Sequence, residues 1–148
     1  HVDASKGMVA WAKENAAASG LSSAPIRYLV DDCVKFVERE IRRGNTYDGI
    51  IMDPPSYGRG PKGEIWKLED NVFPFIQLTA QLLAKDAQFF LINSYTTGLQ
   101  SAVLSYMLNT VITPRLGGCV EADEIGLPVS SSGLVLPCGS SGRWMRMR

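Results

Sequence analysis

Apolar residues along this chain follow two alternating patterns: short continuous runs, and longer segments with helical spacing. The first pattern predicts strands that end near residue 3 and cover residues 26–30, 47–53 and 87–93. Helical spacing predicts helices over residues 5–20, 32–44, 69–83 and 98–111. Strands that alternate with helices form right-handed parallel βαβ units, so we expect an α/β fold with a mainly parallel, doubly wound sheet.

The ends of the first two predicted helices carry residues that commonly cap helices. Ser5 precedes the first helix and either Asp31 or Asp32 precedes the second, where a side-chain oxygen can accept hydrogen bonds from free backbone N–H groups. Gly20 and Gly44 follow these helices, where glycine easily adopts the left-handed conformation. These residues therefore define the expected limits of the first two βα units.

The last third of the chain has a different pattern. Residues 118–144 contain two short strand-like runs joined by a turn rich in serine and glycine. This pattern predicts a C-terminal antiparallel β-hairpin that closes the sheet. We find no repeat, no linker and no sign of a second domain.

Composition narrows the class of protein. The 148 residues are 45% hydrophobic, which is enough for one domain with its own core, and 15 basic residues balance 15 acidic ones. RNA binding would therefore need a local basic patch rather than an overall charge. Three widely spaced cysteines suit reduced thiols, and no apolar run approaches the ~20 residues of a membrane span, so we expect a cytoplasmic protein without a membrane contact. The only histidine is His1, which argues against a metal site or a Ser-His-Asp triad.

Acidic residues follow three of the predicted strands. Asp3 ends the first, Asp31 and Asp32 follow the second, and Asp53 ends the third. In open α/β sheets, ligands bind at the carboxyl ends of the strands. One carboxylate there can accept both hydroxyls of a ribose, and a second can accept an adenine amine. We therefore expect a slot for adenosine, although helix capping is an alternative role for each acid.

Three segments resemble a known family. "VDASKGMVAWAKENAAASGL", "DDCVKF" and "YDGIIMDPPSYGRG" resemble the second, third and fourth motifs of class I S-adenosylmethionine-dependent methyltransferases, and most closely those of the large-subunit ribosomal RNA methyltransferases with an Asp-Pro-Pro loop. The resemblance implies a Rossmann-like fold, S-adenosylmethionine as cofactor and RNA, above all ribosomal RNA, as substrate. The cofactor-binding residues that it implies are Asp3, Ala4, Asp32, Cys33 and Asp53.

The glycine-rich first motif of this family has no counterpart in the chain. In the family it lies about one helix before the second-motif acid, so it would precede His1. We therefore expect residues 1–148 to be the C-terminal portion of a single methyltransferase domain that lacks its first strand, with part of the cofactor site upstream of this sequence.

The loop after the third strand has residues suited to hold a nitrogen acceptor. A carboxylate and a proline carbonyl can accept the two N–H groups of an amine, and an aromatic ring can stack on an extruded base. Two adjacent prolines would keep these groups rigid. The candidate catalytic residues are Asp53, Pro54, Pro55 and Tyr57. The alternative is a structural proline turn with a packed tyrosine.

Tyr95 bears on which atom would be methylated. Related enzymes that make 5-methylcytosine carry a nucleophilic cysteine just after the fourth strand, since the pyrimidine C5 needs activation by a thiolate. This chain has Tyr95 at that position, which favours nitrogen over carbon. Cys138 could be a displaced nucleophile, but a packing role is typical of a thiol on a buried strand.

Other interpretations stay open at this point. Arg59, Lys62 and Lys67 surround Trp66 in a segment that could grip a phosphate and stack a base, or could be a solvated loop with one packed indole. The whole chain could also belong to a methyltransferase that acts on a protein or a small molecule. A third possibility is a degenerate methyltransferase fold that serves as a binding module.

Overall fold

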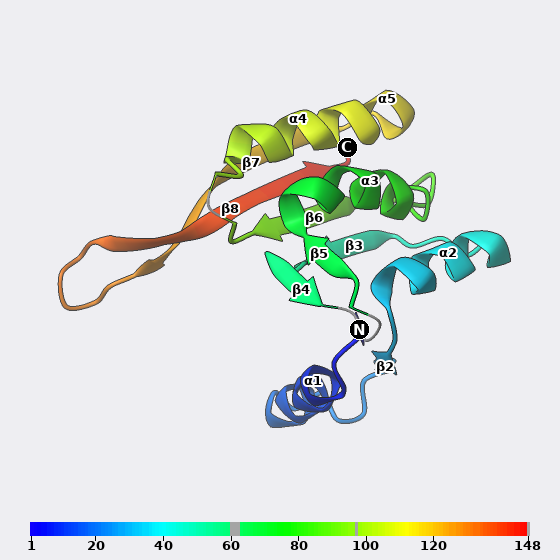
Figure 1. Ribbon diagram of the computed structural model, residues 1–148, viewed down its shortest axis with the longest axis horizontal. Coiled ribbons are helices and arrows are strands. Elements are labelled where there is room, and N and C mark those ends of the chain that lie inside the picture. The colour runs from blue at the N-terminus through cyan, green and yellow to red at the C-terminus, as the bar shows by residue number, and fades with distance from the viewer. Residues whose placement is uncertain (60–62, 97, 148) are drawn as a thin grey trace. The chain divides into compact units, whose positions relative to one another are not determined.

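The computed structural model describes residues 1–59, 63–96 and 98–147 (Figure 1). These residues form two compact units, His1–Asn45 and Thr46–Arg148, and each unit is described by itself. Among the described residues, no helix has the length and apolar character needed to cross a membrane.

The first unit is a βαβα segment. It comprises β1 (Val2–Asp3), α1 (Lys6–Ala18), β2 (Leu29–Val30) and α2 (Cys33–Arg43). β1 and β2 are parallel, with Val2 opposite Leu29 and Asp3 opposite Val30. The predicted βαβ connection is thus confirmed.

The second strand is shorter than the predicted 26–30. Pro25 has no N–H group to donate to a neighbouring strand. The N–H group of Ile26 donates to the carbonyl of Ala24 at 2.7 Å, so it turns back on its own segment. Only Leu29 and Val30 remain to pair with β1.

The predicted helix N-caps in this unit are confirmed. The Ser5 hydroxyl accepts a hydrogen bond from the N–H of Met8 at 3.3 Å. Asp32, rather than Asp31, caps α2, and its carboxylate accepts from the N–H of Lys35 at 3.0 Å.

The glycines predicted at the C-terminal ends of these two helices are also confirmed. Gly44 ends α2 with a φ of 69°, and its N–H donates to the last carbonyls of the helix. Gly20 follows Ser19, the C-cap of α1, with a φ of 75°. Both glycines thus adopt the left-handed conformation that side-chain-bearing residues disfavour.

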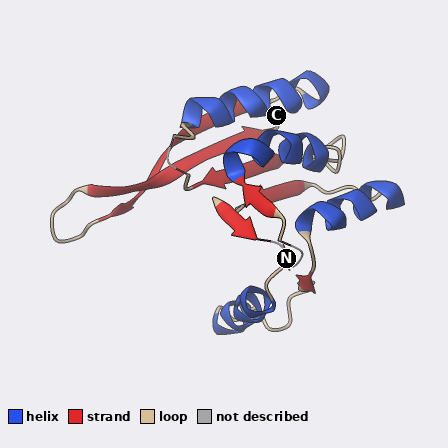
Figure 2. Ribbon diagram, in the orientation of Figure 1, coloured by secondary structure: helices blue, strands red, loops and turns tan. Residues whose placement is uncertain are grey.

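The second unit contains a four-stranded sheet with the order β3-β6-β8-β7 (Figure 2). The strands are β3 (Gly49–Met52), β6 (Phe89–Ser94), β7 (Cys119–Pro128) and β8 (Val135–Met145). β3 and β6 are parallel, while β8 is antiparallel to both of its neighbours. The predicted C-terminal hairpin is confirmed, and it makes this sheet mixed. In Figure 1 the hairpin continues beyond the sheet as a long two-stranded arm.

Two helices cover one face of this sheet and enclose the core of the unit. They are α3 (Leu68–Ala80) and α4 (Ser101–Val111), and the short helix α5 (Thr113–Leu116) follows. The core combines apolar residues of both helices with Met52, Phe90, Ile92 and Trp144. Trp144 is completely buried, and its indole N–H donates to the Gly117 carbonyl at 2.7 Å.

The segment predicted as a loop over residues 54–67 contains two short strands. β4 (Tyr57–Arg59) and β5 (Ile65–Lys67) pair antiparallel, with Tyr57 opposite Lys67 and Gly58 opposite Trp66. Three residues per strand are too few for a periodic signal in the sequence, so the loop prediction was wrong here. Lys62, one of the basic residues singled out above, lies outside the described residues.

Candidate functional site

The first unit gathers carboxylates at one end of its parallel strands. Asp3 lies opposite Val30, and Asp31 and Asp32 follow directly, so all three acids reach the carboxyl end of β1 and β2. Cys33 lies among them. Burial raises the pKa of the Cys33 thiol, and the negative charges of Asp3, Asp32 and Asp31 raise it further. The thiol is therefore protonated at neutral pH.

Each of these acids also has a local structural partner. Asp3 accepts a hydrogen bond from the N–H of Ser5 at 2.7 Å. Asp31 forms an ion pair with Arg39, and Asp32 caps α2. A carboxylate can accept several hydrogen bonds, so these contacts leave acceptor capacity for a ligand.

Cys33 and Ala4 complete the predicted cofactor-binding residues of this unit. The Cys33 thiol donates to the carbonyl of Val2 at 3.6 Å, and Ala4 is exposed between Asp3 and Ser5. The structure thus brings Asp3, Ala4, Asp32 and Cys33 to one end of the first unit. Their contact with an adenosine stays a prediction.

The second unit places Asp53 at the carboxyl end of its parallel strand pair. Met52 pairs with Ile92, and both side chains are buried on the helix-covered face of the sheet. Side chains alternate along a strand, so Asp53 projects from the opposite face, and it is exposed. The two prolines that follow differ, because Pro54 is buried and Pro55 is exposed. This placement agrees with the prediction that the strand ends in a carboxylate at the edge of the sheet.

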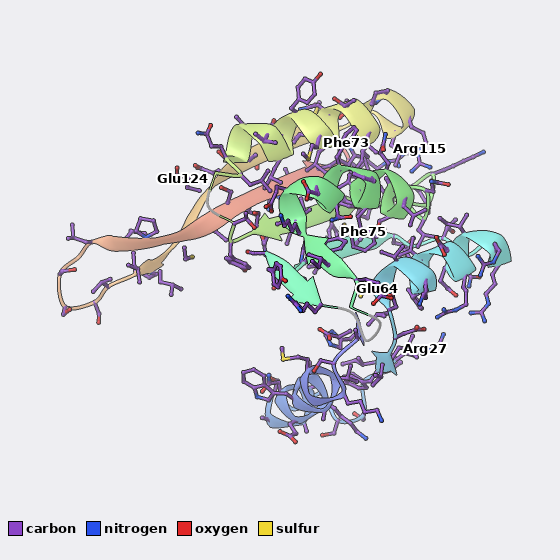
Figure 3. All side chains as sticks on the ribbon, in the orientation of Figure 1. Arg27, Glu64, Phe73, Phe75, Arg115 and Glu124 are labelled. Carbon is purple, nitrogen blue, oxygen red and sulfur yellow. The ribbon has the colours of Figure 1, made fainter. Side chains whose placement is uncertain are left out.

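Trp66 anchors the loop that contains these prolines. Its indole N–H donates to the carbonyl of Pro55 at 2.8 Å. Its ring meets Phe75 of α3 edge to face, with the ring centroids 5.8 Å apart; Phe75 is labelled in Figure 3. Of the two roles left open for Trp66, the packed indole is the one observed. One acceptor site of the Pro55 carbonyl is thereby occupied.

Tyr57 stands on the exposed face of the β4–β5 pair with two basic residues. Its side chain is 52% exposed, and its hydroxyl oxygen accepts a hydrogen bond from Nε of Arg59 at 3.1 Å. Lys67 lies directly opposite Tyr57 in the register. Residues two apart on a strand, and residues paired across strands, share a face. This face therefore presents an aromatic ring beside two cations.

Tyr95 is a residue near Asp53 that the sequence analysis did not include among the candidate site residues. It is the first residue after β6, and β6 lies beside β3. Partial burial raises the pKa of Tyr95, and the negative charge of the Asp53 carboxylate raises it further. The sequence contained a signal for this pair, because residues that follow two adjacent parallel strands reach the same edge of the sheet.

Cys138 lies near this group on β8. It is half-buried, and its thiol donates to the carbonyl of Ile125 on β7 at 3.4 Å. The next residue, Gly139, lies against the Tyr95 ring, since a Cβ atom there would be 2.9 Å from Cδ1 of Tyr95. The hydrogen bond to Ile125 agrees with the expected packing role.

Comparison with solved structures identifies the fold. The chain is 34% identical to a SAM-dependent methyltransferase from Agrobacterium tumefaciens, with a TM-score of 0.89 over 99% of this chain and 48% of that one. The protein SMU.776, solved in complex with SAH, is 20% identical and has a TM-score of 0.66 over 95% of this chain and 38% of its own. The expected α/β, Rossmann-like methyltransferase fold is confirmed.

Comparison with curated proteins gives a narrower similarity. The chain is 27% identical over 109 residues to the ribosomal RNA large subunit methyltransferase K of Neisseria meningitidis, a match that covers 73% of this chain and 30% of that protein. It is 39% identical over 61 residues to the methyltransferase K/L of Pseudoalteromonas atlantica, covering 41% of this chain and 8% of the relative. The chain therefore spans less than a third of these relatives. No family model matches it. The resemblance to methyltransferases of this type is confirmed.

Proposed function

We propose that this chain, which is similar in sequence and fold to the S-adenosylmethionine-dependent methyltransferases, forms part of a cytoplasmic enzyme that methylates a base in RNA, with ribosomal RNA as the favoured substrate. The observation that carries the proposal is the exposed Asp53 carboxylate beside two prolines at the carboxyl end of a parallel strand pair. The similarity to ribosomal RNA methyltransferases over 109 residues supports it.

The acid cluster of the first unit fits S-adenosylmethionine in its chemistry. Three carboxylates close together would repel the phosphates of a nucleotide such as NAD or ATP. They can accept hydrogen bonds from ribose hydroxyls and from an adenine amine, and these are the groups that a phosphate-free adenosine offers. We assign Asp3 with Ala4 to the ribose, and Asp32 with the Cys33 backbone to the adenine. S-adenosylmethionine supplies a methyl group on a sulfonium that needs no activation by a metal.

The loop between β3 and β4, residues 53–56, is called the Asp53 loop. It is suited to bind an amine that accepts this methyl group. The Asp53 carboxylate and the carbonyls of Pro54 and Pro55 can accept the N–H groups and hold the nitrogen lone pair in line with the methyl carbon. As the new N–C bond forms, the S–C bond breaks and its electron pair stays on sulfur. The amine then loses one proton to Asp53 or to water.

The exposed face of β4 and β5 supports RNA as the substrate. Tyr57 can stack on an extruded base, and Arg59 and Lys67 can contact the neighbouring phosphates. This local patch supplies the positive charge that a chain with balanced acids and bases lacks overall.

The cofactor assignment is tested by calorimetric titration with S-adenosylhomocysteine. The titration uses this chain and, in parallel, a form extended upstream. In the binding form, Asp3→Ala should weaken binding by about 1 to 3 kcal/mol through loss of charge-assisted hydrogen bonds. Glu38→Gln, on the exposed side of α2, is the control and should bind normally.

The titration tests both the role of Asp3 and the proposal that the protein is an enzyme. Unchanged affinity in Asp3→Ala would remove Asp3 from the cofactor site. No binding by either form would contradict the enzyme proposal and favour a binding module without cofactor.

The preference for nitrogen over carbon is tested at Cys138. A carbon acceptor would need a thiolate nucleophile, and Cys138 is the cysteine next to Gly139, which lies against the Tyr95 ring. We expect Cys138→Ala to retain methyl transfer to RNA. Loss of transfer together with normal binding of S-adenosylhomocysteine would instead indicate carbon methylation with Cys138 as nucleophile.

A further inference from the structure

Three basic side chains line a shallow depression in the second unit, which we call the basic depression. It is formed by Lys85, Arg115 and Arg146 with Leu83 and Leu116, and its volume is about 480 Å³. The three cations come from different parts of the chain: the segment between α3 and β6, the short helix α5, and the residue after β8. Figure 3 labels Arg115, which lies on the side of this unit away from the hairpin arm. The fold thus gathers positive charge that is dispersed along the sequence.

The basic depression lies at the opposite edge of the sheet from Asp53. Asp53 follows β3 at the carboxyl end of the parallel strand pair, whereas Lys85 precedes β6. Arg146 follows Met145, which pairs with Phe89, the first residue of β6. A strand rises about 3.3 Å per residue, so the six residues of β6 separate the two edges by about 20 Å. A ligand in the basic depression would therefore be remote from the Asp53 loop.

Two backbone carbonyls hold the arginines of the basic depression in place. Nη2 of Arg115 donates to the carbonyl of Ala80, the last residue of α3, and Nη1 of Arg146 donates to the carbonyl of Lys85 at 2.6 Å. A guanidinium has several N–H donors in a planar fork, so one bond to a carbonyl leaves donors for an anion. A side chain that is already fixed loses less freedom when it binds a ligand. The two arginines are thus preorganised to bind an anion.

The ion pairs that the described residues form leave these three cations out. Those ion pairs use Arg39, Arg43 and Arg143. Asp86 is next to Lys85 in the sequence, but it does not line the basic depression. Lysine and arginine are cationic at neutral pH. The basic depression therefore has a local excess of positive charge, although basic and acidic residues balance in the chain as a whole.

We propose that the basic depression binds phosphate groups of an RNA strand and holds the substrate at a distance from the base that is methylated. Phosphate oxygens accept the paired N–H groups of a guanidinium and the ammonium group of a lysine. One water occupies roughly 30 Å³, so the depression has room for a phosphate with its sugar, and Leu83 and Leu116 can contact the carbon atoms of a ribose. The choice of RNA rests on the proposed function, whereas the anion site does not.

RNA binding tests the site without an activity assay. The probe is a fluorescently labelled oligouridine of about 12 nucleotides, and its Kd for this chain is measured by anisotropy at several KCl concentrations. Each phosphate contact to a single strand contributes about 0.7 to the slope of log Kd against log salt concentration. Lys85→Gln should therefore lower this slope by about 0.7. The triple variant with Arg115→Gln and Arg146→Gln should lower it by about 2 and raise the Kd at low salt about tenfold.

Two control variants remove a charge elsewhere. Lys13→Gln removes the same charge as Lys85→Gln from an exposed position of α1. Arg143→Gln is the control for the arginines, because Arg143 is already paired with Glu121 on β7. Both controls should keep the slope of the unmodified protein. The proposal is overturned if the unmodified protein does not bind oligouridine, if Lys85→Gln and the triple variant keep its slope, or if the controls lose as much slope as they do.

Conservative variants separate loss of a phosphate contact from loss of the fold. Arg115→Lys and Arg146→Lys keep the positive charge and should keep the salt slope, whereas the glutamine variants lower it. Lys85→Gln leaves both contacts between arginine and carbonyl in place. Its result therefore stands even if the arginine variants fail to fold.

Competition identifies the anion that the basic depression binds. Unlabelled oligouridine, oligoglutamate of the same length and inorganic phosphate are each added to the complex with labelled RNA. We expect only oligouridine to displace the probe at matched charge concentration. Equal displacement by oligoglutamate would overturn RNA in favour of an acidic protein partner. Equal displacement by inorganic phosphate would reduce the basic depression to a site for a small anion.

A failure of the proposed function would look different. If the variants lower the salt slope as expected but the unmodified protein methylates no RNA, the phosphate site stands and the proposed activity is wrong. Where methyl transfer occurs, the triple variant should raise the KM for RNA about tenfold and leave kcat unchanged, because the contacts are remote from the reacting atoms. A lower kcat with an unchanged KM would contradict the remote role.

Discussion

Among single residues, Asp31 and Asp32 show how adjacent identical side chains take different roles. The backbone at Asp32 is extended, with φ of −67° and ψ of 121°, which directs its carboxylate to the free N–H groups of α2. Asp31 is one residue too early to cap the helix and pairs with Arg39. Only Asp32 therefore uses a carboxylate oxygen to cap the helix, and both acids lie beside Cys33.

Cys33 should make the stability of the protein depend on alkaline pH. Its thiol has a raised pKa in the folded state, so between the ordinary thiol pKa and the raised one the folded protein binds more protons than the unfolded one. The contribution of Cys33 to stability is complete below the ordinary pKa and declines as pH rises through this range. Urea unfolding from about pH 7 to about pH 11 should show a shallower alkaline decline in Cys33→Ala than in the unmodified protein.

A matched substitution separates this effect from a general loss of thiols. Cys119→Ala removes a half-buried thiol from β7, far along the chain from the acid cluster. If Cys33→Ala and Cys119→Ala give the same dependence on pH, the acid cluster around Cys33 does not act as described.

Among the elements, the β4–β5 pair has two faces with different roles. One face carries Trp66, which packs against Phe75 and holds the Pro55 carbonyl. The other carries the exposed Tyr57 with Arg59 and Lys67. A three-residue strand thus links the helix α3 to the Asp53 loop and also presents the proposed RNA contacts.

Trp66→Phe should loosen the Asp53 loop. Phenylalanine keeps the ring contact with Phe75 but loses the hydrogen bond to Pro55, so the free energy of unfolding should fall by about 1 kcal/mol. The rate of methyl transfer should fall by more than the loss of folding stability alone would cause, because the loop positions the acceptor. Chemical denaturation and a methyl-transfer assay measure the two effects.

Trp11→Phe is the control for this substitution. Trp11 is 57% exposed on α1. The same chemical change there should leave both stability and methyl transfer near normal, and an equal effect of both variants would contradict the anchoring role of Trp66.

For the whole molecule, the two units differ in how much apolar core they contain. The buried hydrophobic cluster lies entirely in the second unit and includes Phe90, Ile92, Leu104, Leu108 and Trp144. The buried hydrophobic residues of the first unit are Val9 and Val37. Burial of apolar surface is the main source of stability, so the second unit should be the more stable of the two.

Hydrogen exchange should reveal this difference. We expect backbone amides of β6 and β8 to exchange the most slowly, since they lie in the middle of the sheet and next to the core. Amides of α1 should exchange at least about 100-fold faster, because Val9 is its single buried residue. Mass spectrometry of deuterated peptides measures both. Equal protection of α1 and β6 would show that the chain opens as one unit.

The sequence by itself determined the order of the main elements and the ends of the first helices. Hydrophobic periodicity and capping chemistry act over a few residues, so Ser5, Asp32, Gly20 and Gly44 could be assigned from local pattern. The apolar run that ends at Asp53 likewise predicted an acid at the edge of the sheet. The residues that resemble methyltransferase motifs were sufficient to predict the Rossmann-like fold, which the structural comparison confirms.

Only the tertiary structure decided which side chains meet across the sheet. Tyr95 and Asp53 are far apart in the chain, yet they reach the same edge of the sheet because each follows one strand of the parallel pair β3 and β6. The role of Trp66 depends in the same way on Phe75 and Pro55. Hydrophobic pattern specifies which face of a strand is buried, but strand order and register depend on packing among distant segments. The chemistry of the Asp53 loop therefore follows from contacts that no local pattern contains.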